Sequence, residues 1–503
     1  MNRASATRHS AAGQFVQGLG LLDATMIVAG SMIGSGVFIV SADMARQLGS
    51  TGWLLCAWLL TGALSVMAAL SYGELAAMMP QAGGQYVYLR EAYSPLWGFL
   101  YGWTLFLVIQ TGTIAAVAVA FAKFLGVLLP AVAESQPFIA WGRFRVAPTS
   151  LVAIGVVALL TWSNSTGLRA GKWVQNIFTL AKIAALVLLV VLGLVLGANA
   201  TATQANFTEL WSASAVSVGS GSDPVTVVTP LRGLALLAVL GTALVGSLFS
   251  ADAWNNITFT AGEVKNPRRN LPLSLVLGVG MVCALYCLAN LAYLVTLPLQ
   301  GSPGGGTALA RGMQFAADNR VGTAAAEVML GGPGAAVMAA LIMVSTFGCL
   351  NGMILAGARV YYAMARDGLF FAGVGRLNRQ GVPRNGLLVQ GLWAALLTLS
   401  GTYSDLLDYV ISAALVFYVL TIAGLLRLRR RRPEAPRPYR VWAYPWLPVV
   451  YLLLASLIAV DLLVSAKTRG NTLPGLAIVL SGIPVYALWR LQRLSVEETP
   501  RAP

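Results

Sequence analysis

Residues 20–49 read GLLDATMIVAGSMIGSGVFIVSADMARQLG, and the triplet Gly34-Ser35-Gly36 lies in the middle of this apolar stretch. The stretch is long enough to cross a bilayer, which takes about 20 residues of helix. Glycine weakens a helix, although membrane helices tolerate it better than soluble ones. The triplet therefore has two interpretations. It is either a surface for close helix packing, which the GxxxG spacing of Gly30 and Gly34 would serve, or a point where the helix unwinds.

A second stretch decides between these interpretations. Residues 231–264 read LRGLALLAVLGTALVGSLFSADAWNNITFTAGEV, and the middle, residues 246–256, is small, polar and acidic. A carboxylate such as Asp252 is costly if the helix continues past lipid, and easier to place where a helix breaks and lines a cavity. Paired interrupted helices in two halves of a chain are the best sequence indication of a transporter's central site. We therefore interpret both stretches as broken helices.

The whole chain has the composition of an all-α integral membrane protein. Of its 503 residues, 57% are hydrophobic and 10% are charged, and the mean hydropathy is +0.74. Soluble proteins carry about 25% charged residues. Backbone polar groups in a bilayer must be satisfied inside their own segment, so the apolar blocks are predicted to be helices. Twelve spans are expected, at residues 21–46, 53–79, 97–130, 148–164, 173–197, 232–261, 273–297, 333–362, 386–401, 405–426, 446–466 and 473–489.

The basic residues predict the orientation of these spans. With the N-terminus in the cytoplasm, 22 of the 33 Lys and Arg residues fall on the cytoplasmic side and 8 on the outer side, as the positive-inside rule requires. Both termini are therefore placed in the cytoplasm of a multi-pass cell (inner) membrane protein. The basic segment 1–17 is expected to be a tail rather than a signal peptide. The four arginines at 429–432 are expected to anchor the topology and contact anionic lipid rather than nucleic acid.

Metal, cofactor and enzyme chemistry are not expected. His9 is the only histidine, and Cys56, Cys283, Cys287 and Cys349 lie in apolar blocks, where they act as small hydrophobic residues. The sequence has no nucleophile–base pair and no phosphate-binding loop, which argues against an enzyme. A channel or a receptor is also disfavoured, because neither a filter repeat nor a soluble signalling domain is found.

Two broken helices make a site that suits one class of substrate. The N-terminal end of a half-helix offers free N–H groups and a partial positive charge, which can hold a carboxylate. Carbonyl groups exposed at the C-terminal end of a neighbouring half-helix can hold an ammonium group. An α-amino acid carries both groups on one carbon, and glycine lets it approach the backbone closely. Third-span residues 108–113 are expected to form part of the pocket wall.

Three motifs resemble the amino acid–polyamine–organocation (APC) superfamily, and within it the prokaryotic L-type amino acid transporters. They are GSGVF (34–38), YGELAAMMPQAGGQYVYLREAY (72–93) and FSADAWNNITFTAGEVKNPRRNLPLSL (249–275). The resemblance extends from about Leu19 to the tenth span. It implies a LeuT-like 5+5 inverted repeat with broken helices 1 and 6, two further peripheral helices, and transport by alternating access.

This organisation divides the chain into six parts. We expect a cytoplasmic tail (1–18), a first inverted repeat (19–200), an outer loop (201–231), a second inverted repeat (232–427), peripheral helices 11 and 12 (428–492) and a C-terminal cytoplasmic tail (493–503). Residues 81–96 are amphipathic and predict an interfacial helix on the cytoplasmic side. Residues 301–332 predict an outer loop with helical stretches.

The resemblance also implies roles for residues at the two breaks. Ser35 and Gly36 would bind the substrate carboxylate. The carbonyls of Met32, Phe249 and Asp252 would face the α-amine, and Phe249 would close over the substrate as a gate. The predicted substrate site consists of Met32, Ile33, Gly34, Ser35, Gly36, Phe249, Ser250, Ala251, Asp252 and Asn255, in which Asn255 holds the unwound sixth span.

Lys182, in the otherwise apolar fifth span, has two interpretations. Its long side chain could snorkel to the cytoplasmic surface. The resemblance instead places a lysine beside the first break, where its ammonium stands in for the sodium ion of sodium-coupled relatives. We favour the second interpretation, which gives Lys182 a coupling role and makes transport sodium-independent.

Two features depart from the mammalian L-type pattern. Asp252 and Ala253 stand where glycines are expected, and Asp252 could bond the unwound backbone, accept a proton or attract a cationic substrate. The loop at residues 131–147 contains no cysteine, whereas the mammalian transporters use one there to join a glycoprotein heavy chain. No disulfide-linked heavy chain is therefore expected.

The sequence as a whole predicts a sodium-independent secondary transporter that exchanges neutral L-amino acids. The alternative is a proton-coupled or cationic amino acid or polyamine permease, in which Asp252 supplies the negative charge.

Overall fold

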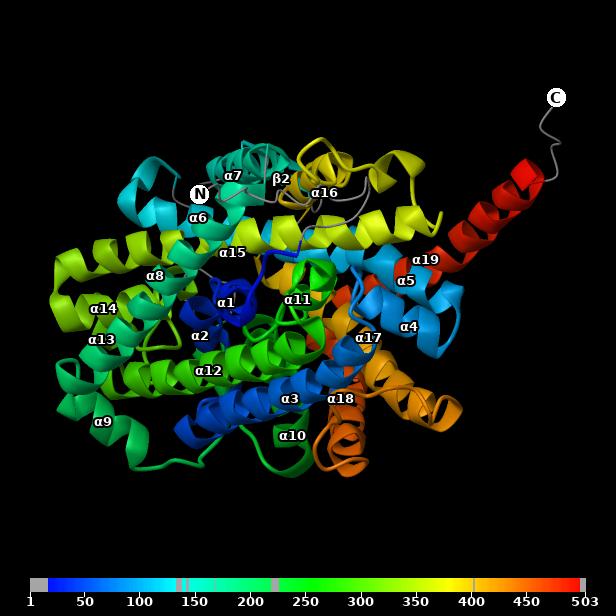
Figure 1. The fold of residues 1–503 in the computed structure, drawn as a ribbon. Coiled ribbons are helices and arrows are strands. Elements are labelled where there is room, and N and C mark those ends of the chain that lie inside the picture. The colour runs from blue at the N-terminus through cyan, green and yellow to red at the C-terminus, as the bar shows by residue number, and fades with distance from the viewer. Residues whose placement is uncertain are drawn as a thin grey trace, which may run out of the picture.

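A computed structural model describes residues 17–132, 138–141, 144–166, 168–218, 226–400 and 403–497, and this part of the chain is predominantly helical (Figure 1). The helices are α1 (Leu21–Met32), α2 (Gly36–Leu48), α3 (Thr51–Met78), α4 (Gln85–Ala92), α5 (Pro95–Thr104), α6 (Gln110–Leu128), α7 (Pro148–Ser165), α8 (Leu168–Val195), α9 (Ala200–Phe207), α10 (Gly233–Ser250), α11 (Asn256–Phe259), α12 (Pro267–Thr296), α13 (Ala308–Arg311), α14 (Val321–Leu330), α15 (Gly332–Arg366), α16 (Arg384–Leu397), α17 (Tyr403–Arg431), α18 (Trp446–Val464) and α19 (Ala466–Glu497). Shorter turns are the π-helical η1 (Leu105–Ile109) and the 3-10 turns η2 (Pro130–Val132), η3 (Ala261–Glu263), η4 (Ala317–Asn319) and η5 (Ala372–Gly375). Two antiparallel hairpins pair β1 (Ile139–Trp141) with β2 (Phe144–Val146) and β3 (Ser214–Val218) with β4 (Thr226–Pro230).

Local sequence signals set several helix ends. The Ser50 hydroxyl accepts the Trp53 N–H and caps α3, as serine commonly does at this position. Helices α5, α7 and α12 begin with proline in the first turn, where its missing N–H would have had no helical partner. Gly49 ends α2 in the left-handed conformation that glycine adopts without strain.

The structure is that of a multi-pass membrane protein, with one span fewer than predicted by length. Ten of the described helices are long and apolar enough to cross a membrane, and the pair α1 and α2, bent by 40°, makes an eleventh. The predicted span at 386–401 corresponds to α16, whose 14 residues extend about 21 Å. That is short of the roughly 30 Å hydrocarbon layer. The described helices therefore provide up to eleven membrane spans by length and composition, and not the twelve that were predicted.

Burial separates a helical core from its periphery. In the span Pro95–Leu128, 89% of an apolar 18-residue stretch is buried inside the protein. The corresponding share is 28% in Trp446–Val464 and 22% in Ala466–Arg490. The last two helices thus lie at the edge, and α19 projects from the body of the molecule (Figure 1). Within the core, α3 runs beside α12, α1 packs on α12 and α8, and α2 packs on α10. This arrangement brings the first and sixth predicted spans together.

The segment predicted to be an interfacial helix is instead inside the protein. Helix α4 occupies Gln85–Ala92, and its first five residues are all buried. Its polar groups meet partners elsewhere in the protein: the Tyr86 hydroxyl donates to Asp367 at 2.7 Å, and Arg90 also pairs with Asp367. The amphipathic pattern correctly indicated a helix but was wrong about its surroundings, because polar residues can face acceptors on neighbouring segments as well as a membrane surface.

The arginine run is also partly internal. Arg429 donates to both carboxylate oxygens of Glu74, at 2.8 and 2.5 Å, and Glu74 is fully buried. Arg432 pairs with Glu91 at 3.2 Å. At least these two arginines therefore connect helix ends to one another, in addition to any contact that their neighbours make with lipid.

Candidate functional site

The first predicted break lies where the sequence placed it. Helix α1 ends at Met32, α2 begins at Gly36, and Ile33, Gly34 and Ser35 connect them. The first N–H groups of a helix have no partner within it. In the part of the chain that the structure describes, no hydrogen bond is made by the N–H groups of Ser35 or Gly36. The start of α2 can therefore accept an anionic group.

The carbonyl groups of this break are occupied by side chains from other helices. Lys182, on α8 and only 1% exposed, donates from Nζ to the carbonyl oxygens of Gly30 at 2.6 Å and Ile33 at 3.0 Å. From α15, the Ser345 hydroxyl bonds the Ile33 carbonyl at 3.2 Å, and the Cys349 thiol bonds the Ser31 carbonyl at 3.0 Å. Lys182 thus points inward to the break and does not snorkel. The sequence indicated the lysine but gave no signal for Ser345 or Cys349.

The second predicted break begins at the end of α10. That helix stops at Ser250, Ala253 has a positive φ of 62°, and α11 is only four residues long. The helical path is therefore interrupted within residues 246–256, as predicted. The amide N–H of Asp252 donates to the Phe249 carbonyl at 3.2 Å, which closes a tight turn at this point.

The two breaks touch at Gly36. A Cβ atom built on Gly36 would lie 2.1 Å from the Ser250 Oγ and 2.8 Å from the Ser250 Cα. Only a residue without a side chain allows the start of α2 to approach the end of α10 this closely.

Tyr286 joins the two breaks from a third helix. Its hydroxyl, on α12, lies 2.9 Å from the Met32 carbonyl oxygen and 3.2 Å from that of Ser250. Its ring packs edge-on against Trp58, with centroids 5.6 Å apart. One phenol thus holds the last carbonyl of α1 next to the last carbonyl of α10. Nothing in the sequence pattern distinguished Tyr286 from other aromatic residues of its span.

Replacement of Tyr286 by Phe tests this connection. The ring and its packing remain, but two carbonyls lose their common donor, so we expect the transport rate to fall about tenfold, from the usual worth of one or two buried hydrogen bonds. Tyr293→Phe is the matched control, because Tyr293 is buried on the same helix and its hydroxyl has no partner among the described residues. Equal rates for the two variants in reconstituted liposomes would show that the hydroxyl contact is unimportant.

Tyr403 contacts two of the predicted site residues. Its hydroxyl lies 3.1 Å from the Ser35 hydroxyl, and its ring meets the Phe249 ring edge-on at a centroid distance of 6.0 Å. The predicted carboxylate binder and the predicted gate thus share one neighbour on α17. The sequence did not indicate Tyr403.

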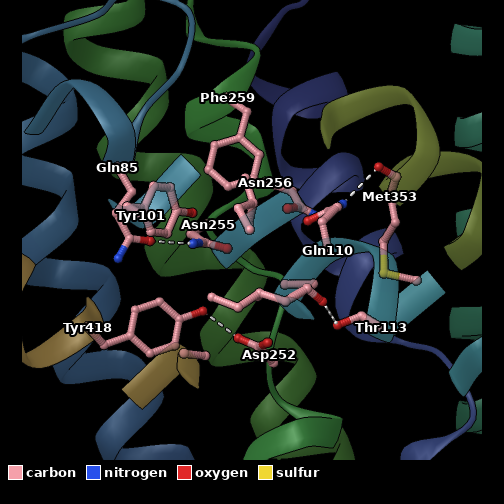
Figure 2. A pocket seen from close by; sticks show the side chains of 14 residues that line it. Gln85, Tyr101, Gln110, Thr113, Asp252, Asn255, Asn256, Phe259, Met353 and Tyr418 are labelled. Atoms are coloured by element: carbon pink, nitrogen blue, oxygen red, sulfur yellow. Dashed lines mark hydrogen bonds between the residues drawn. The ribbon is translucent and has the colours of Figure 1, made fainter. Parts of the chain in front are cut away.

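Asp252 lies between two small spaces in the protein. The first is the pocket in Figure 2, and its wall includes Asp252, Asn255, Gln110 and Tyr418. The second has a mainly apolar wall on the side of α3 and α18 and shares Asp252 and Tyr418 with the first. The Tyr418 hydroxyl donates to the Asp252 carboxylate. Neither wall, within the described residues, includes Lys or Arg.

Residues of the third-span stretch 108–113 line the pocket of Figure 2, and their part in substrate binding stays a prediction. Ile109, Gln110 and Thr113 all line the pocket. Ile109 ends the π-helical turn η1, and Gln110 and Thr113 follow it. Such a turn is a local widening of the helix that often occurs at functional sites. The Gln110 side-chain amide donates to the Met353 carbonyl at 2.8 Å and so ties this wall to α15.

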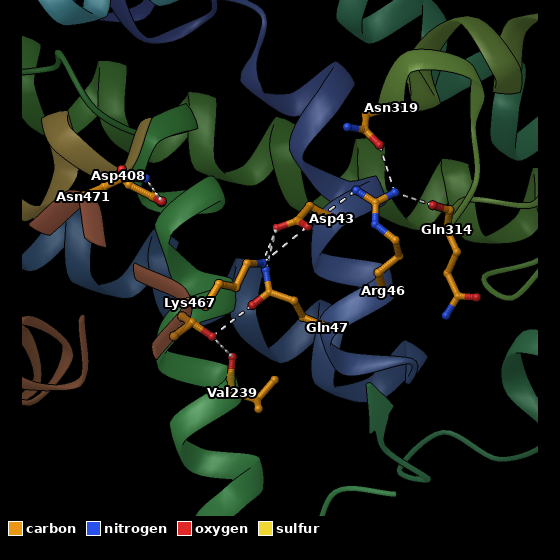
Figure 3. A network of polar contacts seen from close by, with 10 residues as sticks. Asp43, Arg46, Gln47, Val239, Gln314, Asn319, Asp408, Lys467 and Asn471 are labelled. Carbon is orange, nitrogen blue, oxygen red and sulfur yellow. Dashed lines mark hydrogen bonds and ion pairs between the residues drawn. The ribbon is translucent and has the colours of Figure 1, made fainter. Parts of the chain in front are cut away.

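The far end of α2 is fixed by a polar network (Figure 3). Lys467 pairs with Asp43 at 3.1 Å, and the Thr242 hydroxyl donates to Gln47 at 2.9 Å, so α2 is connected to both α19 and α10. Arg46 donates to the Gln314 carbonyl at 2.5 Å. The Lys467–Asp43 pair is about half exposed and contributes at most about 1 kcal/mol. The network therefore orients α2 more than it stabilises the fold.

The structure thus brings the predicted residues of the two breaks into one region and adds several that the sequence did not indicate. The added residues are Gln85, Tyr286, Ser345, Cys349, Tyr403 and Tyr418. In this structure the Met32 and Phe249 carbonyls already accept protein hydrogen bonds. Among the described residues no three His, Cys, Asp or Glu side chains gather into a metal-binding group.

Comparison with known proteins identifies relatives over nearly the whole chain. Residues 19–483 match the amino acid permease family. The chain is 28% identical over 479 residues to the human b(0,+)-type amino acid transporter 1, covering 94% of this chain and 87% of that protein. It is 30% identical to the mouse large neutral amino acids transporter small subunit 2, covering 93% and 80%. It is also 30% identical to the mouse Asc-type amino acid transporter 1, covering 94% and 81%.

Proposed function

The chain belongs to the amino acid permease family, within the APC superfamily, and from this premise we propose that it exchanges neutral L-amino acids across the membrane without sodium. Its relatives are amino acid transporters by name, which supports amino acid transport as the general activity. The proposal places the substrate at the contact between the two helix breaks, with alternating access around it.

The observation that carries the proposal is the position of the Lys182 ammonium. It is buried and donates to two backbone carbonyls of the first break, at 2.6 and 3.0 Å. Backbone carbonyls at the C-terminal ends of half-helices are where sodium-coupled transporters hold their ion. A fixed ammonium there makes a sodium ion unnecessary and electrostatically unfavourable. This contact supports the proposed sodium independence.

The substrate would bind by its two backbone charges. The free N–H groups of Ser35 and Gly36 lie at the start of α2, where a helix favours an anion by about 0.3–1 kcal/mol or more when buried. We propose that they hold the α-carboxylate, with Phe249 as the gate beside it. The α-amine would face the ends of α1 and α10, where the Met32 and Phe249 carbonyls would exchange protein donors for the substrate's ammonium.

The proposed architecture follows the same reasoning. Helices α1 to α8 and α10 to α17 would form two inverted repeats of five spans each, with the short α16 as the ninth span where the bilayer is locally thinned. The basic residues favour both termini in the cytoplasm. The chain would function without a disulfide-linked heavy chain, since residues 131–147 contain no cysteine.

Uptake into liposomes tests sodium independence and exchange together. We expect radiolabelled neutral amino acid to enter vesicles preloaded with unlabelled amino acid several-fold faster than vesicles loaded with buffer. Replacing external sodium with potassium should leave this rate unchanged. Uptake that ignored internal amino acid but followed an imposed proton gradient would contradict exchange, and a requirement for sodium would contradict the role given to Lys182.

A second candidate, cationic amino acid or proton-coupled transport, is favoured by one specific observation. The Asp252 carboxylate is buried, it accepts a hydrogen bond from the Tyr418 hydroxyl, and no basic side chain lines the adjoining spaces in the described structure. A buried carboxylate without a counter-ion is costly. A proton or a cationic substrate would remove that cost.

Asp252→Asn separates the two candidates. The amide has the same shape and can still accept the Tyr418 hydrogen bond, so under the main proposal we expect neutral amino acid exchange to remain within about threefold of wild type. Any uptake of lysine or a polyamine should be lost, because its charge would have no partner. Unchanged lysine uptake would remove the charge argument. If the Asp252→Asn variant lost both the exchange of neutral amino acids and the dependence of transport on pH, proton coupling would be favoured.

A further inference from the structure

Gln85 connects the sixth-span break to two other helices through a single amide group. It is the first residue of α4 and is 1% exposed. Its Oε1 accepts a hydrogen bond from the Asn255 Nδ2 at 3.0 Å, and its Nε2 donates to the Thr421 Oγ1 at 3.0 Å. The three side chains thus form a continuous chain from the break to α17.

The direction of every bond in this chain is determined. The Thr421 hydroxyl donates its only proton to the Phe417 carbonyl at 2.7 Å, so it can only accept from Gln85. The Gln85 Nε2 must therefore face Thr421, and the Gln85 Oε1 must face Asn255. Asn255 in turn must direct its Nδ2 toward Gln85, which leaves its carbonyl oxygen turned the other way. Asn255 lines the pocket, and Figure 2 shows that oxygen on the side away from Gln85.

The residues just before α4 pack directly against α11, which follows the sixth-span break. The Gly83 N–H donates to the Phe259 carbonyl at 3.2 Å. Gly84 has a positive φ of 45°, and a Cβ atom there would lie 2.8 Å from the Thr258 carbonyl carbon. The Gln85 amide is therefore held in place by its own backbone and is a fixed reference for Asn255.

We propose that Gln85 is a positioning residue for substrate recognition, which acts by orienting Asn255 so that a carbonyl oxygen, and not an amide N–H, faces the pocket. This inference rests on the proposed amino acid transport and adds how the pocket selects a hydrogen-bond donor, such as the substrate ammonium group. Without Gln85, the Asn255 Nδ2 loses its acceptor, and the amide can turn so that its N–H group faces a hydrogen-bond donor on the substrate.

The Gln85→Leu variant tests this proposal, and the experiment measures its KM and its maximal exchange rate separately. We expect KM to rise about tenfold, from the loss of one oriented buried hydrogen bond, while the maximal exchange rate stays within about twofold. The substrate is whichever neutral amino acid the wild-type protein transports best. Failure of the transport proposal would appear in the wild-type protein, whereas failure of this inference would appear only as a wild-type KM in the variant.

Gln390→Leu is the matched control for loss of a buried glutamine. Gln390 is fully buried and donates to the Ile354 carbonyl at 3.0 Å, but it is not part of the pocket wall in the described structure. It should lower thermal stability to a similar extent and leave KM unchanged. If Gln390→Leu raised KM as much as Gln85→Leu, the effect would be one of general destabilisation and the proposal would be wrong.

A double-mutant comparison identifies the route of the effect. If Gln85 acts through Asn255, then Gln85→Leu should add nothing to the KM of Asn255→Ala, whereas independent effects would multiply and contradict the proposal.

Thr421→Val is a second variant in case Gln85→Leu does not fold. It removes the group that orients the Gln85 amide, so KM should rise in the same direction by a smaller factor. A wild-type KM in Thr421→Val would also contradict the proposal.

Discussion

Replacing Lys182 with Met or Ala should reduce transport by about a hundredfold or more while leaving the protein folded. Hydrogen bonds to a charged group are worth about 1.5–3 kcal/mol each, and Lys182 makes two, to the carbonyls of Gly30 and Ile33. Met keeps the length of the side chain but supplies no donor, so the carbonyls of Gly30 and Ile33 would lose the ammonium that holds the first break in place. Uptake into liposomes measures the rate, and gel filtration in detergent measures folding.

Lys123→Ala is the control for this prediction. Lys123 also lies in a predicted span, on α6, but it is only partly buried and the first break is held by other residues. It should transport at nearly the wild-type rate. Wild-type transport by Lys182→Met would rule out the role of the ammonium at the first break, whatever the outcome for Lys123.

Gly36→Ala should have the second largest effect, with transport below about a tenth of wild type and a lower melting temperature. The new methyl group would lie 2.8 Å from the Ser250 Cα and closer still to the Ser250 Oγ. The hydroxyl can rotate away, but the backbone cannot, so the two breaks must separate. Overpacking of this kind typically costs about 1–3 kcal/mol, and here the cost falls at the proposed substrate site.

Two further variants test the geometric cause. Gly280→Ala is a control within α12, because a Cβ atom there would meet nothing within 4 Å, and it should be neutral. Ser250→Gly in the Gly36→Ala background removes the Oγ and Cβ contacts and should restore part of the transport. If the double variant is no better than Gly36→Ala alone, steric contact with Ser250 is not the reason for the loss.

The two breaks could be predicted because their signals are local. Glycines within 34–36 and a carboxylate at 252 are unusual inside apolar stretches, and the structure interrupts its helices at these points. The pocket wall near Gln110 was also predictable, since it follows from the position of the third span. Lys182 was identified for the same reason, as a charge in an apolar segment.

The partners of these residues could not be predicted in the same way. Ser345 and Cys349 lie 312 and 318 residues from the backbone carbonyls that they bond, and Tyr286 lies 254 residues from Met32. Membrane helices are apolar on nearly every face, so their sequence has little periodicity to show which side meets a neighbour. A serine or tyrosine in such a helix gives the same pattern whether it is a central contact or a packing residue.

The burial of α4 illustrates the same limit. Its combination of polar and aromatic residues is typical of an amphipathic helix, but a membrane surface and an internal polar cluster satisfy that pattern equally well. Only the folded chain shows that the Gln85 amide meets Asn255 and Thr421. The sequence alone determined the membrane class, the family resemblance and the positions of the two breaks, because these depend on composition and on local departures from it. Tertiary structure alone decided which groups hold the breaks together, because those contacts depend on the relative rotation and depth of helices that are distant in the chain.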